Sequence, residues 1–215
     1  MEEKIKQIRY NAETDRLEID VLTGRATAQE AIQHLQQFDI IPATAELSTA
    51  SVVLTETGKE HRLKEALEAV TDLYDYCIID TPPELGILTS NALTACNGVI
   101  IPAFADADSL EGIQQLYGSI QTIKKYCNPA IEAYGIVITK YNQRTTLAKD
   151  MRENIENLAA VLGIPLYKTV IRENVAIQEA KAVHQTIYAY DRRSKGANDY
   201  IHLCQEVMKQ VEKRK

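Results

Sequence analysis

Residues 74–83 read YDYCIIDTPP, and this stretch decides the fold that the sequence predicts. The apolar run over residues 76–79 predicts a strand, and its lack of polar alternation is typical of a strand covered by helices on both faces. Asp80 follows this run and would stand at the carboxyl end of the strand, where open α/β sheets bind their ligands. A carboxylate there can hold Mg²⁺ directly or through water, because Mg²⁺ prefers oxygen ligands and keeps much of its water shell. The alternative is an aspartate that only caps the turn.

The same pattern continues on both sides of this stretch. Short apolar runs alternate with longer segments of helical period, which is typical of an α/β protein with a parallel sheet. Strands are predicted at residues 38–41, 76–79, 98–101, 134–139 and 167–171. Helices are predicted at residues 109–126, at 147–162 and from about 197 into the charged tail. Gly163, followed by Ile164 and Pro165, ends the second of these helices.

Bulk composition indicates an ordinary globular protein. The chain has 215 residues, of which 45% are hydrophobic and 25% charged, and its formal net charge is −6. This balance excludes a histone-like protein but permits a local basic patch. The four cysteines are widely spaced without a C-x-x-C pair, and the four histidines do not cluster with them or with each other, which disfavours a disulfide framework and a zinc site. No apolar run reaches the roughly 20 residues of a membrane span, so we expect a cytoplasmic protein.

The amino-terminal segment differs from the rest. In residues 1–25 the apolar side chains are scattered among charges and fit neither a helical nor a strand period. We therefore predict a poorly defined segment over residues 1–25 and a single α/β domain over residues 26–215.

Several ordered motifs carry a resemblance to a known family. The sequence DTPP at Asp80 is followed by GILTSNAL at residues 86–93 and VIIP at 99–102, and this order resembles the Walker B region of the ParA/Soj partition ATPases. These proteins belong to the ParA/MinD class of deviant P-loop proteins. Further similar segments are DIIPAT (39–44), EHRLKEAL (60–67), SLEG (109–112), GIVITKY (135–141), KTVIRENV (168–175) and SKGA (194–197). The resemblance covers about residues 20 to 210.

One family motif is absent from the sequence. The family opens with a phosphate loop, K-G-G-x-G-K-[ST], whose backbone N–H groups hold the nucleotide phosphates. Gly58-Lys59 is the only Gly-Lys pair here, no glycine stands among the five residues before it, and Glu60 replaces the Ser or Thr that binds magnesium. The expected fold is a three-layer P-loop-like parallel sheet with helices on both faces, without the first strand, phosphate loop and first helix.

That absence has two expected consequences. The chain should bind neither ATP nor Mg²⁺ by itself, although the intact family hydrolyses ATP with Mg²⁺. The strand ending at Asp80 should also have an unpaired edge, which is an aggregation hazard unless something covers it. Either a longer natural protein or a partner contains the missing part, so that this chain is truncated, or residues 1–25 replace it.

The resemblance also implies site residues. Asp80 is implied as the residue that binds magnesium or positions the attacking water. Thr139, Lys140, Ile171 and Arg172 fall in segments that hold the adenine base, although the family usually has proline at the position of Arg172. The alternative is that Thr139 only ends a strand and Ile171 packs in the core.

In the family, nucleotide-loaded dimers bind DNA without sequence preference, and a ParB-type centromere-binding partner stimulates hydrolysis. Such binding requires contacts to phosphates. The implied DNA-contacting residues are Arg144, Lys168, Arg192, Arg193 and Lys195. The alternative is that these are ordinary solvated charges. The resemblance further implies a possible homodimer that is nucleoid-associated if DNA binding is retained.

Two other functions stay open. The first is a non-enzymatic adaptor that binds DNA or a ParB-type partner regardless of nucleotide. The second is a MinD-like membrane-surface ATPase, which needs a carboxyl-terminal helix with a broad apolar face. Val207, Met208 and Val211 form only a narrow stripe there, so no membrane association is expected.

Overall fold

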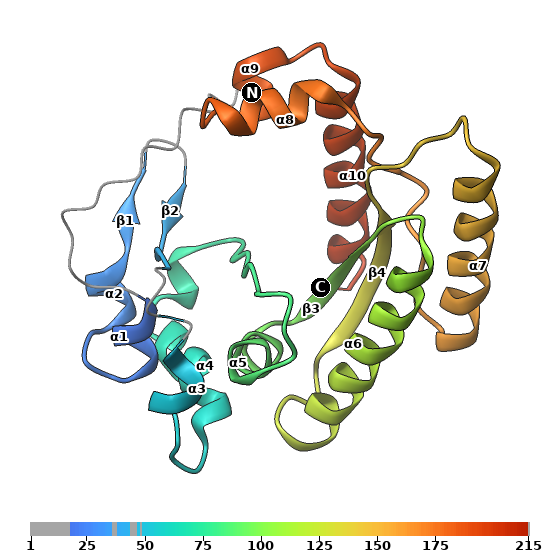
Figure 1. Ribbon diagram of the computed structural model, residues 1–215. Helices are drawn as coiled ribbons and strands as arrows, with labels where there is room; N and C mark the ends of the chain where they lie inside the picture. The colour runs from blue at the N-terminus through green and yellow to red at the C-terminus, as the bar shows by residue number, and fades with distance from the viewer. Residues whose placement is uncertain (1–17, 36–37, 44–46, 48, 215) are drawn as a thin grey trace. The chain divides into compact units, whose positions relative to one another are not determined.

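The computed structural model describes residues 18–35, 38–43, 47 and 49–214 (Figure 1). Most of the segment predicted to be poorly defined, residues 1–17, lies outside the described residues. The described chain groups into two compact units. We refer to residues 99–117 and 133–214 as the sheet unit, and to the described part of residues 18–98 together with 118–132 as the helical unit. The predicted domain boundary at residue 25 stays a prediction.

The sheet unit is built on two neighbouring strands. β3 (Gly98–Ala103) and β4 (Glu132–Ile138) form a two-stranded sheet and are joined by the long helix α6 (Ala107–Tyr126). Both strands run in the same direction (Figure 1), and parallel strands require such a crossover. The strands predicted at 98–101 and 134–139 and the helix predicted at 109–126 are confirmed.

Local signals position the helices that follow β4. α7 (Thr146–Leu162) begins after Thr145, whose hydroxyl accepts a hydrogen bond from the Ala148 amide at 3.3 Å. It ends at Gly163, which adopts the left-handed conformation at φ 69°, as predicted. The remaining helices of the unit are α8 (Val175–Ala182), α9 (Ile187–Asp191) and α10 (Lys195–Glu212). The predicted carboxyl-terminal helix is therefore confirmed.

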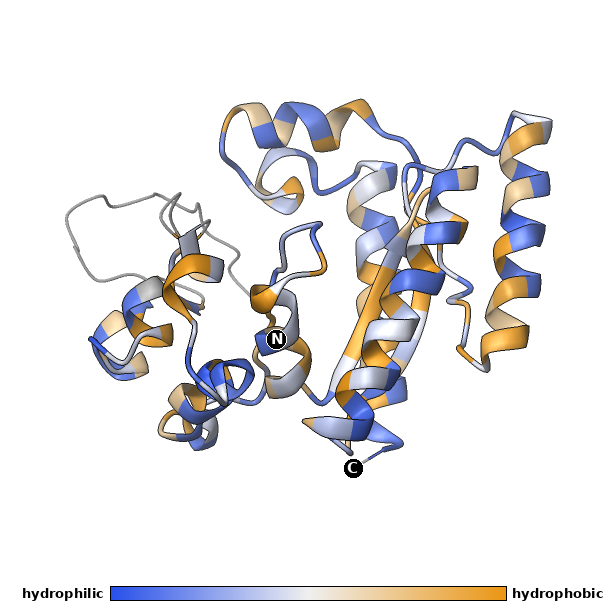
Figure 2. Cartoon of the chain, turned by 60° about the horizontal axis from the view of Figure 1, so that its bottom comes forward, coloured by the Kyte–Doolittle hydropathy of each residue, from blue (hydrophilic) through white to orange (hydrophobic). Residues whose placement is uncertain are grey.

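One part of the core of the sheet unit lies between β4, residues 164–172 and α10. Tyr167 and Ile171 are buried against Val137, and the apolar residues of α10 pack on this cluster. Gly135 permits this contact, because a Cβ atom there would lie 2.6 Å from the Tyr167 ring. Figure 2 shows the central strands as largely hydrophobic. The strand predicted at 167–171 is reduced to isolated parallel bridges, at Leu166 and Arg172.

The helical unit consists of short elements around apolar clusters. Its helices are α1 (Glu18–Leu22), α2 (Ala28–Ala31), α3 (Ala50–Val53), α4 (Arg62–Glu68) and α5 (Ile87–Ala95), with 3-10 helices at Lys59–His61 and Thr71–Leu73. Leu22, Leu54 and Leu63 form the centre of one cluster. α2 begins with a capping box in which Thr27 and Glu30 exchange hydrogen bonds.

Two strand predictions in the helical unit are corrected by the structure. At 38–41, only Asp39–Ile40 forms a strand, β2, and it pairs antiparallel with β1 (Gln33–His34) instead of joining a parallel sheet. The strand predicted at 76–79 is wrong, because this segment is irregular and the Ile78 side chain is 94% exposed. Cys77, whose apolar surroundings in the sequence suggest burial, is exposed as well. No described strand pairs with this segment, so its backbone has no ladder to join.

Candidate nucleotide and DNA-binding sites

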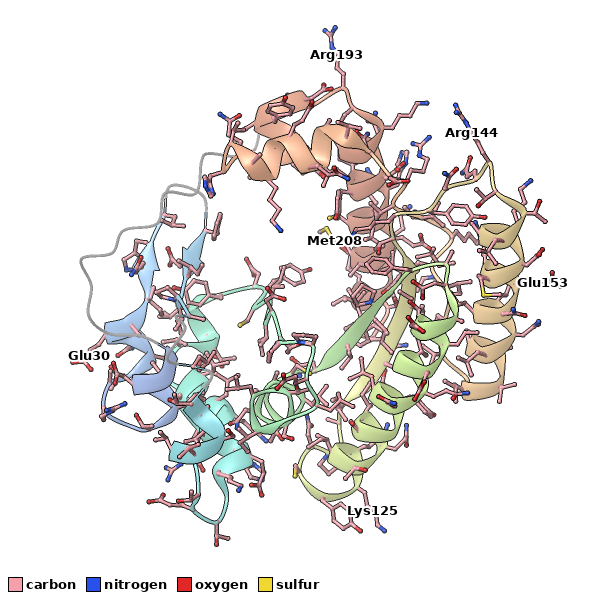
Figure 3. The ribbon with its side chains drawn as sticks, viewed as in Figure 1. Glu30, Lys125, Arg144, Glu153, Arg193 and Met208 are labelled. Carbon is pink, nitrogen blue, oxygen red and sulfur yellow. The ribbon has the colours of Figure 1, made fainter. Side chains whose placement is uncertain are left out.

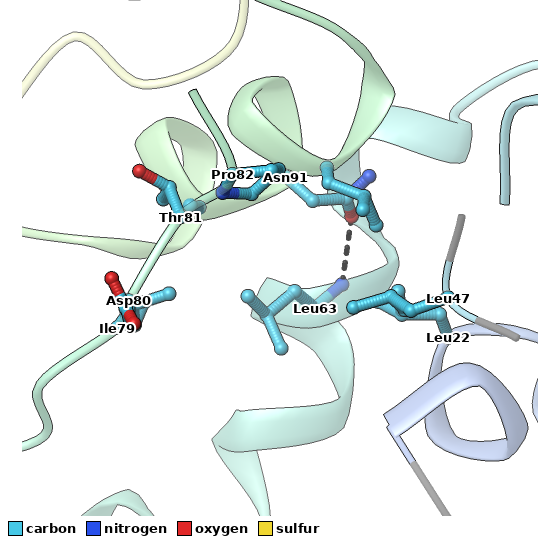
Figure 4. A pocket seen from close by; sticks show the side chains of 10 residues that line it. Leu22, Leu47, Leu63, Ile79, Asp80, Thr81, Pro82 and Asn91 are labelled. Atoms are coloured by element: carbon cyan, nitrogen blue, oxygen red, sulfur yellow. Dashed lines mark hydrogen bonds between the residues drawn. The ribbon is translucent and has the colours of Figure 1, made fainter. Parts of the chain in front are cut away.

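Asp80 lies in the helical unit, on the irregular segment that precedes α5. Its side chain is exposed, and no hydrogen bond or ion pair joins its carboxylate to another residue in the described part of the chain. Figure 4 shows Asp80 beside Ile79 and Thr81 on a small pocket. This pocket has a volume of about 20 Å³, which is room for a water molecule and too little for a nucleotide.

The oxygen donors at this place fit a hydrated magnesium ion. The Asp80 carboxylate and the neighbouring Thr81 hydroxyl are both exposed, and such oxygens are the ligands that Mg²⁺ takes. The phosphates of a nucleotide find no matching cradle in the described residues. Their glycines with positive φ are Gly24, Gly58 and Gly163, which are far apart in sequence and form no contiguous nest of N–H groups.

Asn91 forms another wall of the pocket and was missed by the sequence analysis. Its side chain is only 1% exposed. Its Oδ1 accepts a hydrogen bond from the Leu63 amide at 3.0 Å, and its Nδ2 donates to the Lys59 carbonyl at 2.9 Å (Figure 4 shows the first bond). The only sequence signal was an amide among the apolar residues of GILTSNAL. Asn91 therefore holds residues 59–63 against α5.

Thr139 and Lys140 lie at the carboxyl end of β4 in the sheet unit. The Thr139 amide donates to the Ala103 carbonyl at 2.8 Å, which continues the pairing of the two strands. Lys140 adopts a left-handed conformation at φ 49°, uncommon for a residue other than glycine. Its Nζ lies 4.7 Å from the centroid of the Phe104 ring, within the range of a cation–π interaction.

Ile171 and Arg172 lie beside these residues, as the adenine-site interpretation requires. The Ile171 amide donates to the Ile138 carbonyl at 2.9 Å, and the Tyr141 amide donates to the Ile171 carbonyl at 3.0 Å. Ile171 is buried in the core, which the packing interpretation also expects. The structure thus brings Thr139 and Lys140 together with residues 171–172, whereas Asp80 belongs to the other compact unit.

The Arg172 guanidinium is held by Asp199 of α10. Nε donates to Oδ2 at 2.9 Å and Nη2 donates to Oδ1 at 2.6 Å, while the Arg172 amide also donates to Oδ2 at 3.0 Å. Burial would raise the pKa of Asp199, but the hydrogen bonds and the charge of Arg172 together outweigh it and hold that pKa below its ordinary value. Sequence analysis missed Asp199, because nothing near it in the sequence indicates its partner.

A second carboxylate of α10 orders the loop before Arg172. Glu206 accepts hydrogen bonds from the Lys168 amide at 2.9 Å and the Thr169 amide at 3.1 Å. Burial pushes its pKa upward, but these amide bonds, the Thr169 hydroxyl and the nearby charge of Lys168 hold the pKa below its ordinary value. Lys168 itself keeps an exposed side chain.

The implied DNA-contacting residues all belong to the sheet unit and are exposed. They are Arg144, Lys168, Arg192, Arg193 and Lys195. Arg144 and Arg193 point outward on the same side of this unit (Figure 3). Within the described residues none of the five side chains lies in an ion pair. Their charges are therefore available to a polyanion.

The described helices contain no segment long and apolar enough to cross a membrane. The apolar face of α10 is used within the sheet unit, since Leu203 and Val207 pack on the Val137 cluster. This packing argues against the MinD-like alternative, which requires that face to meet a lipid surface.

Known proteins resemble this chain over most of its length. A family model described as an AAA domain matches residues 4–133. The chain is 39% identical to the sporulation initiation inhibitor protein Soj of Bacillus subtilis over 199 residues, covering 91% of this chain and 78% of Soj. It is 35% identical to the chromosome partitioning protein ParA of Caulobacter vibrioides, covering 88% of this chain and 72% of that protein.

Solved structures agree with the fold. The crystal structure of cobyrinic acid a,c-diamide synthase from Mycobacterium smegmatis superposes with a TM-score of 0.79 at 26% identity, covering 94% of this chain and 76% of that one. The same enzyme with a bound ATP analog and magnesium gives a TM-score of 0.69 at 28% identity, covering 76% and 66% of the two chains.

The fold and the matching structures together indicate the class of protein. Parallel strands joined by helical crossovers, superposing on a protein solved with an ATP analog and magnesium, make this an α/β protein of the P-loop ATPase type. The chain belongs to the ParA/Soj family of partition ATPases, and its relatives in Caulobacter vibrioides and Treponema pallidum are named for chromosome partitioning.

Proposed function

We propose that this chain contributes the magnesium-facing and base-facing parts of a partition ATPase and binds no ATP with its own 215 residues. The observation that carries the proposal is that a candidate magnesium ligand is present while the phosphate-binding motif is absent. Asp80 offers an exposed carboxylate without a protein partner in the described residues, whereas the sequence contains no K-G-G-x-G-K segment. Asp80 can therefore serve as a ligand for magnesium, whereas the sequence contains no loop that would bind the triphosphate.

The remaining residues have separate roles in this proposal. With nucleotide bound, magnesium would neutralise charge on the phosphates, and Asp80 would hold that ion through water or orient the attacking water. The paired edges at Thr139-Lys140 and Ile171-Arg172 would offer backbone groups and the Phe104–Lys140 pair to the base. Asp199 would keep Arg172 in place while the backbone of Arg172 faces the ligand.

A restored protein tests the role of Asp80. A version carrying a K-G-G-x-G-K-T loop with its strand and helix is expected to hydrolyse ATP, and Asp80→Asn in that version should lower the turnover rate by on the order of 10² or more. Asp75→Asn is the matched control, because Asp75 is an exposed aspartate of the same segment and should leave turnover unchanged. Equal activity of the Asp80→Asn protein and its parent would contradict the proposal.

We also propose that the basic side of the sheet unit binds duplex DNA without sequence preference. Support comes from the exposed side chains of Arg144, Lys168, Arg192, Arg193 and Lys195, none of which lies in an ion pair among the described residues. Binding through phosphates should weaken steeply with salt. A gel shift at low ionic strength with two unrelated duplexes of equal length is expected to give equal midpoints, and a large preference for one sequence would contradict phosphate-based binding.

A nucleotide-independent adaptor is the second candidate function. The observation that favours it is that the basic residues belong to the sheet unit, whereas Asp80 belongs to the helical unit. DNA binding by the version that carries the K-G-G-x-G-K-T loop, measured with and without Mg-ATP, separates the two. An unchanged midpoint supports the adaptor, and a midpoint that falls only with Mg-ATP supports the ATPase. In either case we propose a ParB-type protein as partner, a homodimer as the active form, and the nucleoid as its location.

A further inference from the structure

Glu60, His61 and Cys127 lie together in the helical unit. Glu60 and His61 stand in the 3-10 helix Lys59–His61, and Cys127 directly follows α6. One potential metal-binding atom from each side chain, a carboxylate oxygen, an imidazole nitrogen and the thiol sulfur, lies within 4.8 Å of the other two. All three residues are half-buried. The expectation that no histidine accompanies a cysteine is therefore wrong for this pair.

Two buried asparagines hold the ligand-bearing segments against the same helix. Asn91 of α5 fixes residues 59–63 through its bonds to the Lys59 carbonyl and the Leu63 amide. Asn128 fixes the turn after α6, because its Nδ2 donates to the Leu93 carbonyl at 3.1 Å and to the Cys96 carbonyl at 2.7 Å. Both asparagines are buried, and the bonds to the Leu63 amide and the Leu93 carbonyl are shielded from water. α5 thus serves as a common support that keeps His61 near Cys127.

We propose that Glu60, His61 and Cys127 bind a Zn²⁺ ion, with water or an exchangeable ligand in the fourth position. Thiolate, imidazole and carboxylate are the donors that zinc takes in proteins, and three protein ligands leave one tetrahedral position open. Bonds of about 2.0–2.3 Å to zinc place tetrahedral donors about 3.3–3.8 Å apart. The three atoms therefore need to approach by about 1 Å, which rotation of half-buried side chains permits.

Binding has a defined proton balance. The Cys127 thiol gives up its proton and its sulfur forms the bond to zinc, while His61 binds as the neutral imidazole. The affinity should therefore rise with pH. Thiolate and imidazole favour zinc over magnesium, which prefers oxygen ligands, so this site is chemically distinct from Asp80. The inference stands independently of the proposed function, because no nucleotide or DNA enters it.

Cobalt absorption tests the site directly. The full chain, stripped of metal with a chelator and kept reduced without added thiols, is titrated with Co²⁺ and then with Zn²⁺. We expect a near-ultraviolet thiolate-to-cobalt band that saturates at one equivalent and disappears as Zn²⁺ displaces Co²⁺. Cys127→Ser should remove the band, and His61→Ala should weaken cobalt binding on the order of tenfold or more.

Matched controls and a second measurement keep the test decisive. Cys204→Ser and His34→Ala change an exposed cysteine and an exposed histidine, and both should bind cobalt like the parent. In the unmodified chain, Zn²⁺ should protect Cys127 from alkylation while Cys77 stays reactive, measured by peptide mass spectrometry. The proposal is overturned by an absent band, by a band that survives Cys127→Ser, or by equal alkylation of Cys127 with and without Zn²⁺.

Discussion

The segments 76–79 and 98–101 have similar local sequences and opposite fates in this protein. Both are short apolar runs, CII and VII at their centres, and both predict a buried parallel strand. Residues 98–101 form β3 next to β4, whereas residues 76–79 stay irregular and exposed. The difference is the neighbour: β3 has β4 at hydrogen-bonding distance, and no described strand is available to 76–79. An apolar run therefore indicates the capacity to form a strand, and a partner decides whether the strand forms.

Truncation of an apolar side chain gives the largest contrast. Ile136→Ala in β4 removes a side chain that is fully buried and should destabilise the protein by about 3–4 kcal/mol. Ile78→Ala removes a side chain that is almost fully exposed and should change stability by less than about 0.5 kcal/mol. Urea denaturation of both variants measures this contrast. A cost at Ile78 similar to that at Ile136 would mean that residues 76–79 form a buried strand in solution.

Close packing at Gly135 of β4 can be tested by replacing this glycine. A Cβ atom at Gly135 would approach the Tyr167 ring to 2.6 Å and the Pro165 carbonyl oxygen to 3.1 Å, so Gly135→Ala should destabilise the sheet unit by about 1–3 kcal/mol. Gly112 of α6 meets nothing within 4 Å, and Gly112→Ala should stabilise the helix by about 0.5–1 kcal/mol. Thermal unfolding of the Gly135→Ala and Gly112→Ala proteins distinguishes crowding at Gly135 from a general effect of replacing glycine. Equal changes in unfolding temperature in the two variants would contradict the crowding explanation.

The loss of folding stability at acid pH tests how much the Asp199 and Glu206 carboxylates of α10 stabilise the sheet unit. Asp199 and Glu206 have lowered pKa values when folded, so their stabilisation is present above their unfolded pKa values, about 3.9 and 4.3, and is lost as pH falls through that range and below. Asp199→Asn should lower stability at pH 7 by about 1–2 kcal/mol, because Arg172 is one-third exposed and keeps some water. The variant should also lose less stability than the parent between pH 5 and pH 3. This window brackets the ordinary pKa of a carboxyl group, about 4.

Denaturation midpoints at several pH values measure this difference. Asp191→Asn is the control, because Asp191 is exposed on α9 and pairs with no cation among the described residues. Its acid limb should follow that of the parent. An Asp199→Asn protein with the parent's pH dependence would show that the Arg172 pair does not stabilise the folded state.

Charge reversal on the sheet unit should affect stability least. Arg144→Glu and Arg193→Glu alter exposed side chains without ion pairs among the described residues, so each should change stability by less than about 0.5 kcal/mol. If each contacts one phosphate, each should reduce the salt slope of DNA binding by about 0.9. Lys125→Glu lies outside the sheet unit and is the matched control. Unchanged DNA binding in a protein that carries both Arg144→Glu and Arg193→Glu would identify these arginines as ordinary surface charges.

Local patterns predict much of this fold. The period of residues 109–126, the Gly163 stop and the apolar runs of β3 and β4 each depend on neighbours in the sequence, and each is confirmed. The pairing of β2 with β1 and the loss of the strand at 76–79 depend on partners distant in the sequence, so the pattern of either segment alone was insufficient.

The candidate sites divide in the same way. Asp80 could be picked out from the sequence because it follows a recognisable apolar run, and Thr139-Lys140 because the segment GIVITKY resembles the partition ATPases. The Arg172–Asp199 pair, the bonds of Asn91 and the approach of His61 to Cys127 could not, because each joins residues that only folding brings together. Their residue types are common and their spacing follows no motif.

The central claim is that a magnesium-facing carboxylate stands in this sequence without a cradle for the triphosphate. Calorimetric titration of the purified 215-residue chain with Mg-ATP tests it most directly. We expect no saturable heat up to millimolar nucleotide while circular dichroism shows a folded protein. Saturable binding with a micromolar dissociation constant would contradict the claim.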